Sequence, residues 1–526
     1  MSARRTPTIA VVLAVCLLGA LACTSPGTGP GGGAAGARDA ADGPRDDDLA
    51  VADAGPRWRA CPEVVRRRYG SAPETMRYDC ATIDVPLDWA AATGPEVPTL
   101  PLALLRVRAV GQRERVGTLV VNPGGPGVSG VDAAAAMSLG RLSDEILNRF
   151  DVVGFDPRGV GRSAGISCVS DADWDAVFGA DQDPRDPAEF AALVELGRRV
   201  GAGCGRRYGD RLGAYSTYQS ARDLDAVRVA VGDDQLTYLG YSYGTLLGAT
   251  YAHLHPDRVR AMVLDGAIDP AQGLVSGSRQ QAAGFERAFE AFARWCAAAT
   301  ARCPPGADAP GLLDEMLAQA RRQPVAGADG RAATAGWIFY AVVAAMYDDG
   351  DWPRLGQALA ALHDGDPGEV FALADRYTGR GDDGSYSDLF DANLVINCAD
   401  RDVELDPVGI RELQRRWRAE HPVFGGALAV GLLTCAAWPG PADPYPSGPA
   451  IGAPPIVVIG TTGDPATPYE QAPRLAGALG VGVLVTWEAD RHTAYPRSAC
   501  VAAAVDAYLL DLVVPADGLR CRDDAG

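Results

Sequence analysis

The sequence predicts an α/β protein in which helices cover a mostly parallel central sheet and a mainly helical cap domain is inserted. Two observations favour this fold class. Short apolar runs alternate with helical patterns along most of the chain, which is typical of parallel strands joined by helices. Between about residues 270 and 449 this rhythm disappears, and helical patterns separated by loops rich in proline and glycine replace it. We therefore expect a core built from two stretches of chain.

Six apolar runs are the predicted central strands. They are residues 116–121, 151–155, 236–241, 259–264, 456–459 and 483–487. Within the cap, residues 285–299 and 335–347 have helical patterns. The predicted division of the chain is a signal segment 1–23, a linker 24–56, a first core part 57–269, the cap 270–449 and a second core part 450–526.

The first residues resemble an export signal. Arg4 and Arg5 precede an apolar stretch, Ile9 to Leu21, that is too short to span a bilayer comfortably. Small residues then precede Cys23, as in lipoprotein signals, where the cysteine is lipidated and becomes the mature N-terminus. We expect an exported protein held at the outer face of the membrane through Cys23, with an ordinary secretion signal as the alternative. The linker is rich in Gly, Ala, Asp and Pro, which predicts a flexible tether.

The charge of the chain argues against one large class of partners. The formal net charge is −19, and no lysine occurs, so every strongly basic side chain is arginine. An acidic chain repels phosphate backbones, and nucleic-acid binding is therefore not expected. The same charge favours solubility and the attraction of cationic groups such as a peptide α-amine. We expect a monomer.

The cysteines favour disulfide bonds. Ten of the twelve lie beyond the predicted signal, and an even number in an exported chain is typical of a disulfide framework. No CxxC pair or histidine-rich cluster indicates zinc. Pairing by proximity along the chain gives a hypothesis that sequence alone does not fix: Cys61–Cys80, Cys168–Cys204, Cys296–Cys303, Cys398–Cys435 and Cys500–Cys521.

Two copies of the pattern Gly-x-Ser-x-Gly compete for the role of nucleophile. The glycines are needed because the serine lies in a tight strand-to-helix turn, where flanking side chains would clash. Ser242 follows an apolar run, 236–239, and precedes a helical pattern, 245–253. Ser163 follows a glycine-rich loop and precedes no helical pattern. The context therefore identifies Ser242 as the candidate nucleophile of an α/β-hydrolase fold.

A nucleophilic serine needs a base, and the chain has five histidines: His253, His255, His363, His421 and His492. In the α/β-hydrolase fold the triad follows the order serine, acid, histidine. His492 follows the last predicted strand, where this fold carries its base. His253 and His255 end the helix that begins after Ser242, and the other two histidines fall in the cap. His492 is therefore the candidate base.

The acid of the triad orients the histidine and stabilises its cationic form. Asp464 lies just past the predicted strand 456–459, in a loop where the triad acid is expected. Asp490 is the alternative, but it lies two residues from His492 on the same loop and would have difficulty reaching the imidazole ring. We therefore expect Asp464 to be the acid.

Acyl transfer also needs donors for the oxyanion, usually two backbone N–H groups. One donor is the residue after the nucleophile, here Tyr243. The other comes from a loop after an early strand, and the loop 122–127, Asn-Pro-Gly-Gly-Pro-Gly, occupies that place. We expect the N–H groups of Gly125 and Tyr243 to form the oxyanion hole.

Taken together, these motifs resemble those of the prolyl-iminopeptidase-like serine peptidases. The resemblance rests on residues 122–127, 154–163, 240–244, 463–468 and 491–493, and it covers about residue 57 to the C-terminus. It is closest to the secreted tripeptidyl aminopeptidases of actinomycetes and their mycobacterial lipoprotein relatives. Pro123 stands where prolyl iminopeptidases carry histidine, which favours the tripeptidyl branch. The resemblance implies a cap over the active site, cleavage near free N-termini and no cofactor.

The resemblance also implies that acidic cap residues hold the α-ammonium of the substrate. Asp400 and Glu404 are the candidates, although each is equally consistent with a solvated cap surface. The predicted activity is that of an exported serine hydrolase that releases short peptides or residues through an acyl-enzyme. The alternatives are an esterase or lipase of the same fold and, less favoured, a non-catalytic surface lipoprotein that binds peptides.

Overall fold

The structure is a computed structural model, and it describes residues 55–92, 97–401 and 406–522. The predictions for the signal segment, Cys23 and Glu404 lie outside the described residues, as does nearly all of the predicted linker. In the described part of the chain, no helix is long and apolar enough to cross a membrane, and no cluster of His, Cys, Asp or Glu could hold a metal ion.

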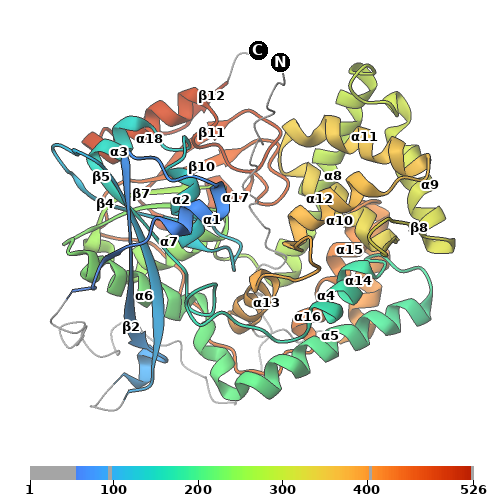
Figure 1. Cartoon of the computed structure of the whole chain (residues 1–526), viewed down its shortest axis with the longest axis horizontal. Helices are drawn as coiled ribbons and strands as arrows, with labels where there is room; N and C mark the ends of the chain where they lie inside the picture. Colours follow the sequence, from blue (N-terminus) through green and yellow to red (C-terminus); the bar gives the residue numbers. More distant parts are fainter. Residues whose placement is uncertain (1–54, 93–96, 402–405, 523–526) are drawn as a thin grey trace, which may run out of the picture.

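A ten-stranded sheet forms the centre of one half of the molecule (Figure 1). The strand order is β1-β2-β3-β5-β4-β6-β7-β10-β11-β12. The first three strands in this order are antiparallel, and the remaining seven are parallel. The strands are β1 (Arg59–Ala60), β2 (Met76–Pro86), β3 (Thr99–Ala109), β4 (Gly117–Asn122), β5 (Phe150–Phe155), β6 (Leu236–Tyr241), β7 (Val259–Asp265), β10 (Ile456–Thr461), β11 (Gly482–Trp487) and β12 (Leu519–Cys521).

Helices cover both faces of the sheet, which is why the central strands are continuously apolar. Every residue of β5, β6 and β10 is buried. One face packs against α1 (Glu63–Tyr69), α2 (Gly130–Met137), α3 (Asp144–Arg149) and α18 (Ala499–Asp511). The other face packs against α6 (Thr217–Val231), α7 (Tyr243–Leu254) and α17 (Gln471–Leu479). The structure confirms the predicted α/β-hydrolase fold with its mostly parallel sheet.

The cap is a helical unit beside the sheet, with a hydrophobic core of its own (Figure 1). Most of it is inserted between β7 and β10. The inserted elements are α8 (Leu274–Ala298), α9 (Ala309–Arg322), β8 (Val325–Ala326), β9 (Ala332–Ala333), α10 (Ala335–Met346), α11 (Trp352–His363), α12 (Gly368–Thr378), α13 (Leu389–Ala399), α14 (Pro407–Glu420), α15 (Gly425–Val430) and α16 (Leu433–Ala436).

A second segment of chain completes the cap. The helices α4 (Asp171–Gly179) and α5 (Pro187–Tyr208) follow β5, and Figure 1 shows them beside α14, α15 and α16. Their apolar side chains, including Trp174 and Phe178, belong to the hydrophobic core of the cap. The sequence-based division assigns this segment to the first core part, whereas its buried face packs with the cap.

The five predicted disulfides are all formed: Cys61–Cys80, Cys168–Cys204, Cys296–Cys303, Cys398–Cys435 and Cys500–Cys521. Proximity along the chain was therefore the correct guide to connectivity. The first and last bonds secure the edges of the sheet. The other three lie in the hydrophobic core of the cap.

A buried ion pair connects the sheet to the helices behind it. Arg158 and Asp223 are both fully buried, and the guanidinium donates two hydrogen bonds of 2.7 and 2.5 Å to the carboxylate. Its remaining N–H groups donate to the carbonyl oxygens of Pro86, Leu87 and Ala214. Every donor of this arginine is therefore satisfied, and one side chain secures three segments of chain.

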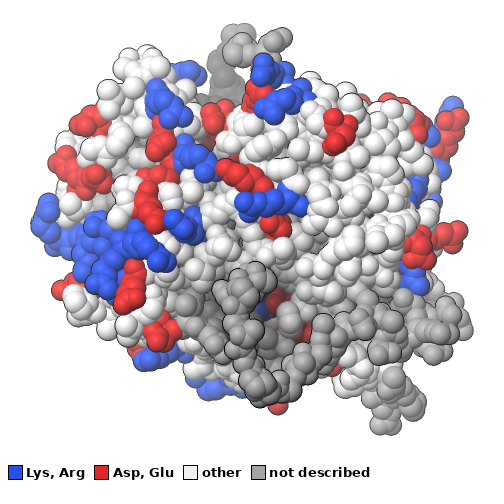
Figure 2. Space-filling model, turned by 180° about the vertical axis from the view of Figure 1, so that it is seen from behind, with Lys and Arg blue, Asp and Glu red and all other residues white. Residues whose placement is uncertain are grey.

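Arginine and acidic side chains are interspersed over the face of the molecule seen in Figure 2. The described residues also include ion pairs between arginine and aspartate that are largely buried, such as Arg418–Asp183 and Arg321–Asp181.

Candidate active site

Ser242 lies at the turn between β6 and α7, at the carboxyl edge of the sheet. Its backbone has φ 55° and ψ −122°, in the left-handed half of conformational space that only a strongly constrained residue other than glycine adopts. A Cβ on Gly240 would lie 2.4 Å from the carbonyl oxygen of Gly244, and a Cβ on Gly244 would lie 2.8 Å from that of Asn122. Both glycines of the motif are therefore required by close backbone contacts, as the sequence pattern predicts.

Ser163, the serine of the second motif, is fully buried. Its hydroxyl donates a 2.6 Å hydrogen bond to the carbonyl oxygen of Asp156 and accepts one of 2.8 Å from the N–H of Ala103. A hydroxyl with these two partners stabilises the start of the loop after β5, and it faces no base. The structure therefore favours Ser242 over Ser163.

His492 and Asp464 meet at the same edge of the sheet. Asp464 follows β10 and His492 follows β11, and these parallel strands are neighbours. The two carboxylate oxygens of Asp464 lie 2.8 and 2.9 Å from Nδ1 of His492, and both side chains are buried. This contact leaves Nε2 as the ring nitrogen that can act as a base. The alternative acid, Asp490, makes no such contact in the described structure.

Two threonines complete the surroundings of Asp464, and the sequence analysis does not single them out. Thr467 donates to the carboxylate through its N–H at 2.9 Å and its hydroxyl at 3.0 Å. The same hydroxyl lies 3.4 Å from Nδ1 of His492. The N–H groups of Ala466 and Thr493 also donate to Asp464. These donors satisfy the charged form of the acid, which a buried carboxylate requires.

A second buried carboxylate, Asp265, joins the nucleophile to the histidine loop. It ends β7, and its carbonyl oxygen accepts the N–H of Ser242 at 2.8 Å. Its carboxylate accepts the N–H groups of Ala494 and Tyr495, just after His492, at 2.7 to 3.0 Å. Burial raises the pKa of Asp265 to about 7, although these hydrogen bonds act in the opposite direction. Asp265 therefore connects the turn that carries Ser242 to the loop that carries His492.

Ser242 and His492 contact the same dipeptide, Asp265–Gly266, from different directions. Ser242 binds the carbonyl of Asp265, and a Cβ on Gly266 would lie 3.2 Å from Cε1 of His492. The described residues include no hydrogen bond between Oγ of Ser242 and the ring of His492. In enzymes without substrate this contact is often long, and it tightens when the substrate binds. Ser242 and the ring of His492 thus both pack against one dipeptide at the carboxyl edge of the sheet.

The loop after β4 packs directly on the turn that carries Ser242. A Cβ on Gly124 would lie 3.0 Å from the backbone nitrogen of Tyr243 and 3.1 Å from Cβ of Ser242. The loop is secured from the cap, because Nδ2 of Asn393 donates a 3.0 Å hydrogen bond to the carbonyl oxygen of Pro126. Gly125 has φ 111°, which a residue with a side chain rarely adopts. The two predicted donors therefore lie on adjoining segments.

The cap reaches the histidine loop through the segment after α10. The N–H of His492 donates a 3.0 Å hydrogen bond to the carbonyl oxygen of Tyr347, and the two rings meet edge to face at 5.4 Å. Arg491 forms ion pairs with Asp348 and Asp349. The position of the imidazole is therefore set by the cap as well as by the sheet.

A pocket of about 120 Å³ opens beside His492. Its wall includes Pro123 and Tyr241 from the core and Tyr347 and Tyr377 from the cap. It also contains the charged side chains Arg141, Arg376, Arg497, Asp348 and Asp351. Both aspartates are paired, since Asp348 contacts Arg497 at 2.7 Å and Asp351 contacts Arg376 at 2.6 Å.

Asp400, a predicted amine-binding residue, is buried, and its carboxylate accepts the N–H and the hydroxyl of Thr217 at 2.6 and 2.7 Å. The Thr217 hydroxyl also lies 2.6 Å from the hydroxyl of Tyr243, the residue after Ser242. Burial raises the pKa of Asp400 to about 7. Asp400 therefore supports the turn from inside the protein, and its contact with a substrate amine stays a prediction. The sequence pattern could not show the contact with Thr217, because α6 and α13 are far apart in the chain.

This fold and site define the class: a serine hydrolase of the α/β-hydrolase fold with a helical cap. Two family models match the chain, one described as the alpha/beta hydrolase fold over residues 117–303 and one described as TAP-like protein over residues 421–521.

Relatives of known name extend over most of the chain. Serine protease Hip1 of Mycobacterium tuberculosis is 37% identical, and the alignment covers 84% of this chain and 87% of that protein. Carboxylesterase B of the same species is 38% identical, with 88% and 89% covered. Tripeptidyl aminopeptidase of Streptomyces coelicolor is 32% identical, with 85% and 83% covered. The chain belongs to this family of α/β-hydrolases.

Proposed function

We propose that the chain is an exported aminopeptidase that releases short peptides from free N-termini, with Ser242, His492 and Asp464 as its catalytic triad. The observation that carries the proposal is the contact of His492 Nδ1 with Asp464, next to a serine held in a strained turn. The relatives named tripeptidyl aminopeptidase and serine protease support a peptide substrate.

The proposed reaction has two acyl-transfer steps. His492 takes the proton of Ser242 through Nε2 as the hydroxyl attacks the scissile carbonyl carbon. The N–H groups of Gly125 and Tyr243 stabilise the negative oxygen of the tetrahedral intermediate. His492 then gives the proton to the leaving amine, whose C–N bond breaks, and an acyl-enzyme remains. Water attacks the ester by the same route and regenerates Ser242.

The test compares the two serines of the two motifs. Ser242→Ala is expected to lower kcat by a factor on the order of 10⁴ to 10⁶, because the nucleophile is lost. Ser163→Ala is the matched control: it removes two buried hydrogen bonds, so it lowers the thermal midpoint while kcat stays within a few-fold. A fluorophosphonate probe should label the Ser163→Ala protein and fail to label the Ser242→Ala protein. Near-normal turnover by Ser242→Ala would remove Ser242 from the mechanism.

An esterase is the second candidate, because carboxylesterase B is among the relatives and the same triad cleaves esters. Three substrates separate the candidates: a tripeptide amide with a free amine, the same peptide with an acetylated amine, and a short p-nitrophenyl ester. An aminopeptidase requires the free amine. Cleavage of the ester with neither peptide cleaved would favour the esterase.

Glu404 is a candidate for binding the α-ammonium of the substrate. Glu404→Gln is expected to raise KM for the free-amine peptide alone.

Export and lipid attachment at Cys23 are part of the same proposal. The five disulfides support an oxidising location outside the cytoplasm. Cys23→Ser is expected to abolish incorporation of a labelled fatty acid into the protein without changing its specific activity. Incorporation of the label into the variant would contradict the attachment at Cys23.

A further inference from the structure

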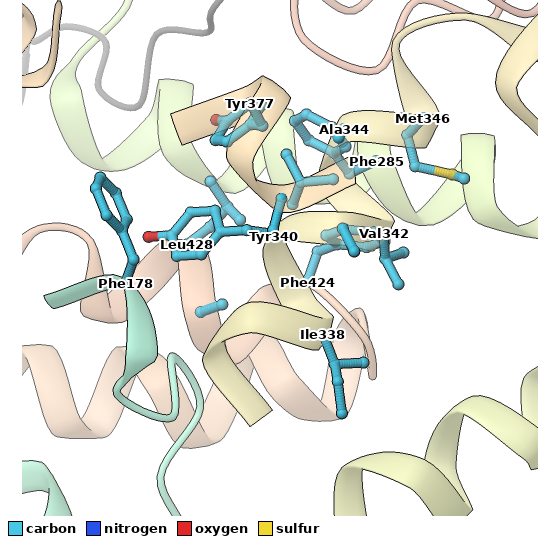
Figure 3. Close-up of a cluster of buried hydrophobic side chains, with 14 of the residues drawn as sticks. Phe178, Phe285, Ile338, Tyr340, Val342, Ala344, Met346, Tyr377, Phe424 and Leu428 are labelled. Atoms are coloured by element: carbon cyan, nitrogen blue, oxygen red, sulfur yellow. The ribbon is translucent and has the colours of Figure 1, made fainter. Parts of the chain in front are cut away.

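The cap contains a second cavity, of about 120 Å³, that does not include the triad. Its wall is apolar and strongly aromatic, and none of its residues is charged. Representative members come from five helices, namely Phe178 of α4, Leu196 of α5, Tyr340 of α10, Phe390 of α13 and Leu428 of α15. Figure 3 shows Phe178, Tyr340, Tyr377 and Leu428 around this part of the cap. An apolar cavity of about 150 Å³ in another protein stays dry and binds benzene.

The cavity adjoins the active-site pocket. Tyr377 lines both, so the two spaces meet at this side chain. A continuous row of rings leads from the base to the cavity: His492 to Tyr347 at 5.4 Å, Tyr347 to Tyr377 at 6.1 Å and Tyr377 to Tyr340 at 5.6 Å. The wall residues Asn393 and Phe390 lie on α13, the helix that binds the oxyanion loop through Asn393.

The two pockets differ in chemistry, and this difference indicates how a substrate is divided between them. The pocket at His492 carries five charged side chains, whereas the cavity wall offers only Gln182, Asn393, Thr434 and the tyrosine hydroxyls as polar groups. A charged group loses its hydration in such a space without gaining a partner, and an apolar group gains from leaving water. The cavity therefore suits a ring or an alkyl chain and excludes an ammonium or a carboxylate.

We propose that this cavity is a specificity subsite that binds an apolar portion of the acyl half of the substrate, entering past Tyr377. The proposal deepens the proposed function and rests on it. The apolar portion is the side chain of a residue in the released peptide; the alkyl chain of an ester offers the same chemistry, and the experiment distinguishes the two sources.

The test fills the cavity. Leu196→Trp adds an indole to the wall from α5, which contributes nothing to the triad or the oxyanion loop. Leu317→Trp is the matched control, because Leu317 is a half-buried leucine of α9 that packs on the same hydrophobic core and lines neither pocket. Thermal midpoints and fluorophosphonate labelling establish that both variants are folded and carry a reactive serine.

Three free-amine series are assayed, in which X is Ala, Leu, Phe or Glu: X-Ala-Ala, Ala-X-Ala and Ala-Ala-X, each linked to aminomethylcoumarin. In the wild type and in Leu317→Trp, one series is expected to show kcat/KM about 10- to 100-fold higher for Leu or Phe than for Ala, with Glu disfavoured. In Leu196→Trp this gain should disappear while the all-alanine substrate is unchanged. The subsite proposal is overturned if Leu196→Trp keeps the higher kcat/KM for Leu or Phe, or if no series shows this difference in the wild type.

An ester arm separates this proposal from the proposed function. If p-nitrophenyl esters are cleaved and no free-amine peptide is, the aminopeptidase proposal fails. The subsite is then supported by a preference for octanoate over acetate that Leu196→Trp removes and Leu317→Trp retains. If Leu196→Trp and Leu317→Trp prefer octanoate over acetate to the same extent, the subsite proposal is overturned.

Discussion

Asp464 is the proposed acid of the triad. It accepts hydrogen bonds from His492, Thr467, Ala466 and Thr493, so its carboxylate is fixed beside the ring of His492. Asp464→Asn replaces that charge with a neutral amide and disturbs the tautomer of His492. We expect kcat to fall by about 10⁴ with little change in thermal midpoint.

The control for this prediction is the neighbouring carboxylate. Asp490→Asn changes the same chemistry on the histidine loop without touching the ring, and kcat should remain within a few-fold of the wild type. The assignment of the acid would be reversed if the Asp490 variant lost activity while the Asp464 variant kept it.

Asp400 makes stability depend on pH. Burial raises its pKa from 3.8 in an unfolded chain to about 7 in the folded protein. The folded protein therefore keeps a proton that the unfolded chain releases, so this contribution is complete below about pH 4 and is lost as the pH rises through 7. The loss amounts to about 4 kcal/mol in the free energy of unfolding.

Asp400→Asn removes the titrating group and keeps its size. Its thermal midpoint should rise relative to the wild type between pH 5 and pH 8, as measured by differential scanning calorimetry. The exposed Asp382→Asn should follow the wild type across the same range. Parallel pH profiles for wild type and Asp400→Asn would show that Asp400 does not titrate in this range.

The sequence predicted where three candidate residues lie, while their catalytic roles remain a proposal. Ser242, Asp464 and His492 each follow a predicted strand, and parallel strands bring their carboxyl ends to one edge. Asp265 ends such a strand as well, so the same reasoning could have found it. Asp400 could not be interpreted, because its partner Thr217 is distant in the chain and its burial depends on how the cap meets the core.

At the scale of elements, the role of the buried ion pair can be tested through Arg158, which binds Asp223 and three carbonyl oxygens. Arg158→Met leaves the carboxylate buried without its partner. We expect the free energy of unfolding to fall by about 3–5 kcal/mol, measured by urea unfolding. The double variant Arg158→Met/Asp223→Leu should recover part of this loss, because no unpaired charge remains; equal stability of the single variant and the wild type would contradict the assigned role.

The elements of the sheet differ in how clearly the sequence reveals them. All six predicted strands are present, since residues buried on both faces form continuous apolar runs. The antiparallel strands β2 and β3 were missed. β2 alternates between buried and exposed residues and gives a weaker signal, whereas β3 contains a continuous buried run that could have been predicted. The helices α4 and α5 were given to the core, because only their long-range packing shows that they belong to the cap.

At the scale of the whole molecule, the disulfides fall into two groups. Cys80 and Cys500 are half-buried, so each bond at the sheet edges has an accessible sulfur, whereas both cysteines of each cap bond are buried. A thiol reductant should therefore cleave Cys61–Cys80 and Cys500–Cys521 at least about tenfold faster under native conditions. Differential alkylation with mass spectrometry measures the order in which the disulfides are reduced.

Loss of each bond should lower the free energy of unfolding by about 2–4 kcal/mol. In urea the protein is unfolded, and the cap disulfides should be reduced as fast as the other two. This measurement is the control that burial, and not the bond itself, sets the rate. Faster reduction of Cys296–Cys303 in the native protein would contradict the buried position of that bond.

The central sheet is completed by strands from both ends of the chain, since β7 pairs with β10 across the entire inserted cap. Synthesis proceeds from the N-terminus, so Ser242 leaves the ribosome long before His492. If the proposed triad is correct, the serine has no base until β10 and β11 have joined the sheet. Docking of the second core part would then be the folding step that also switches on the hydrolase.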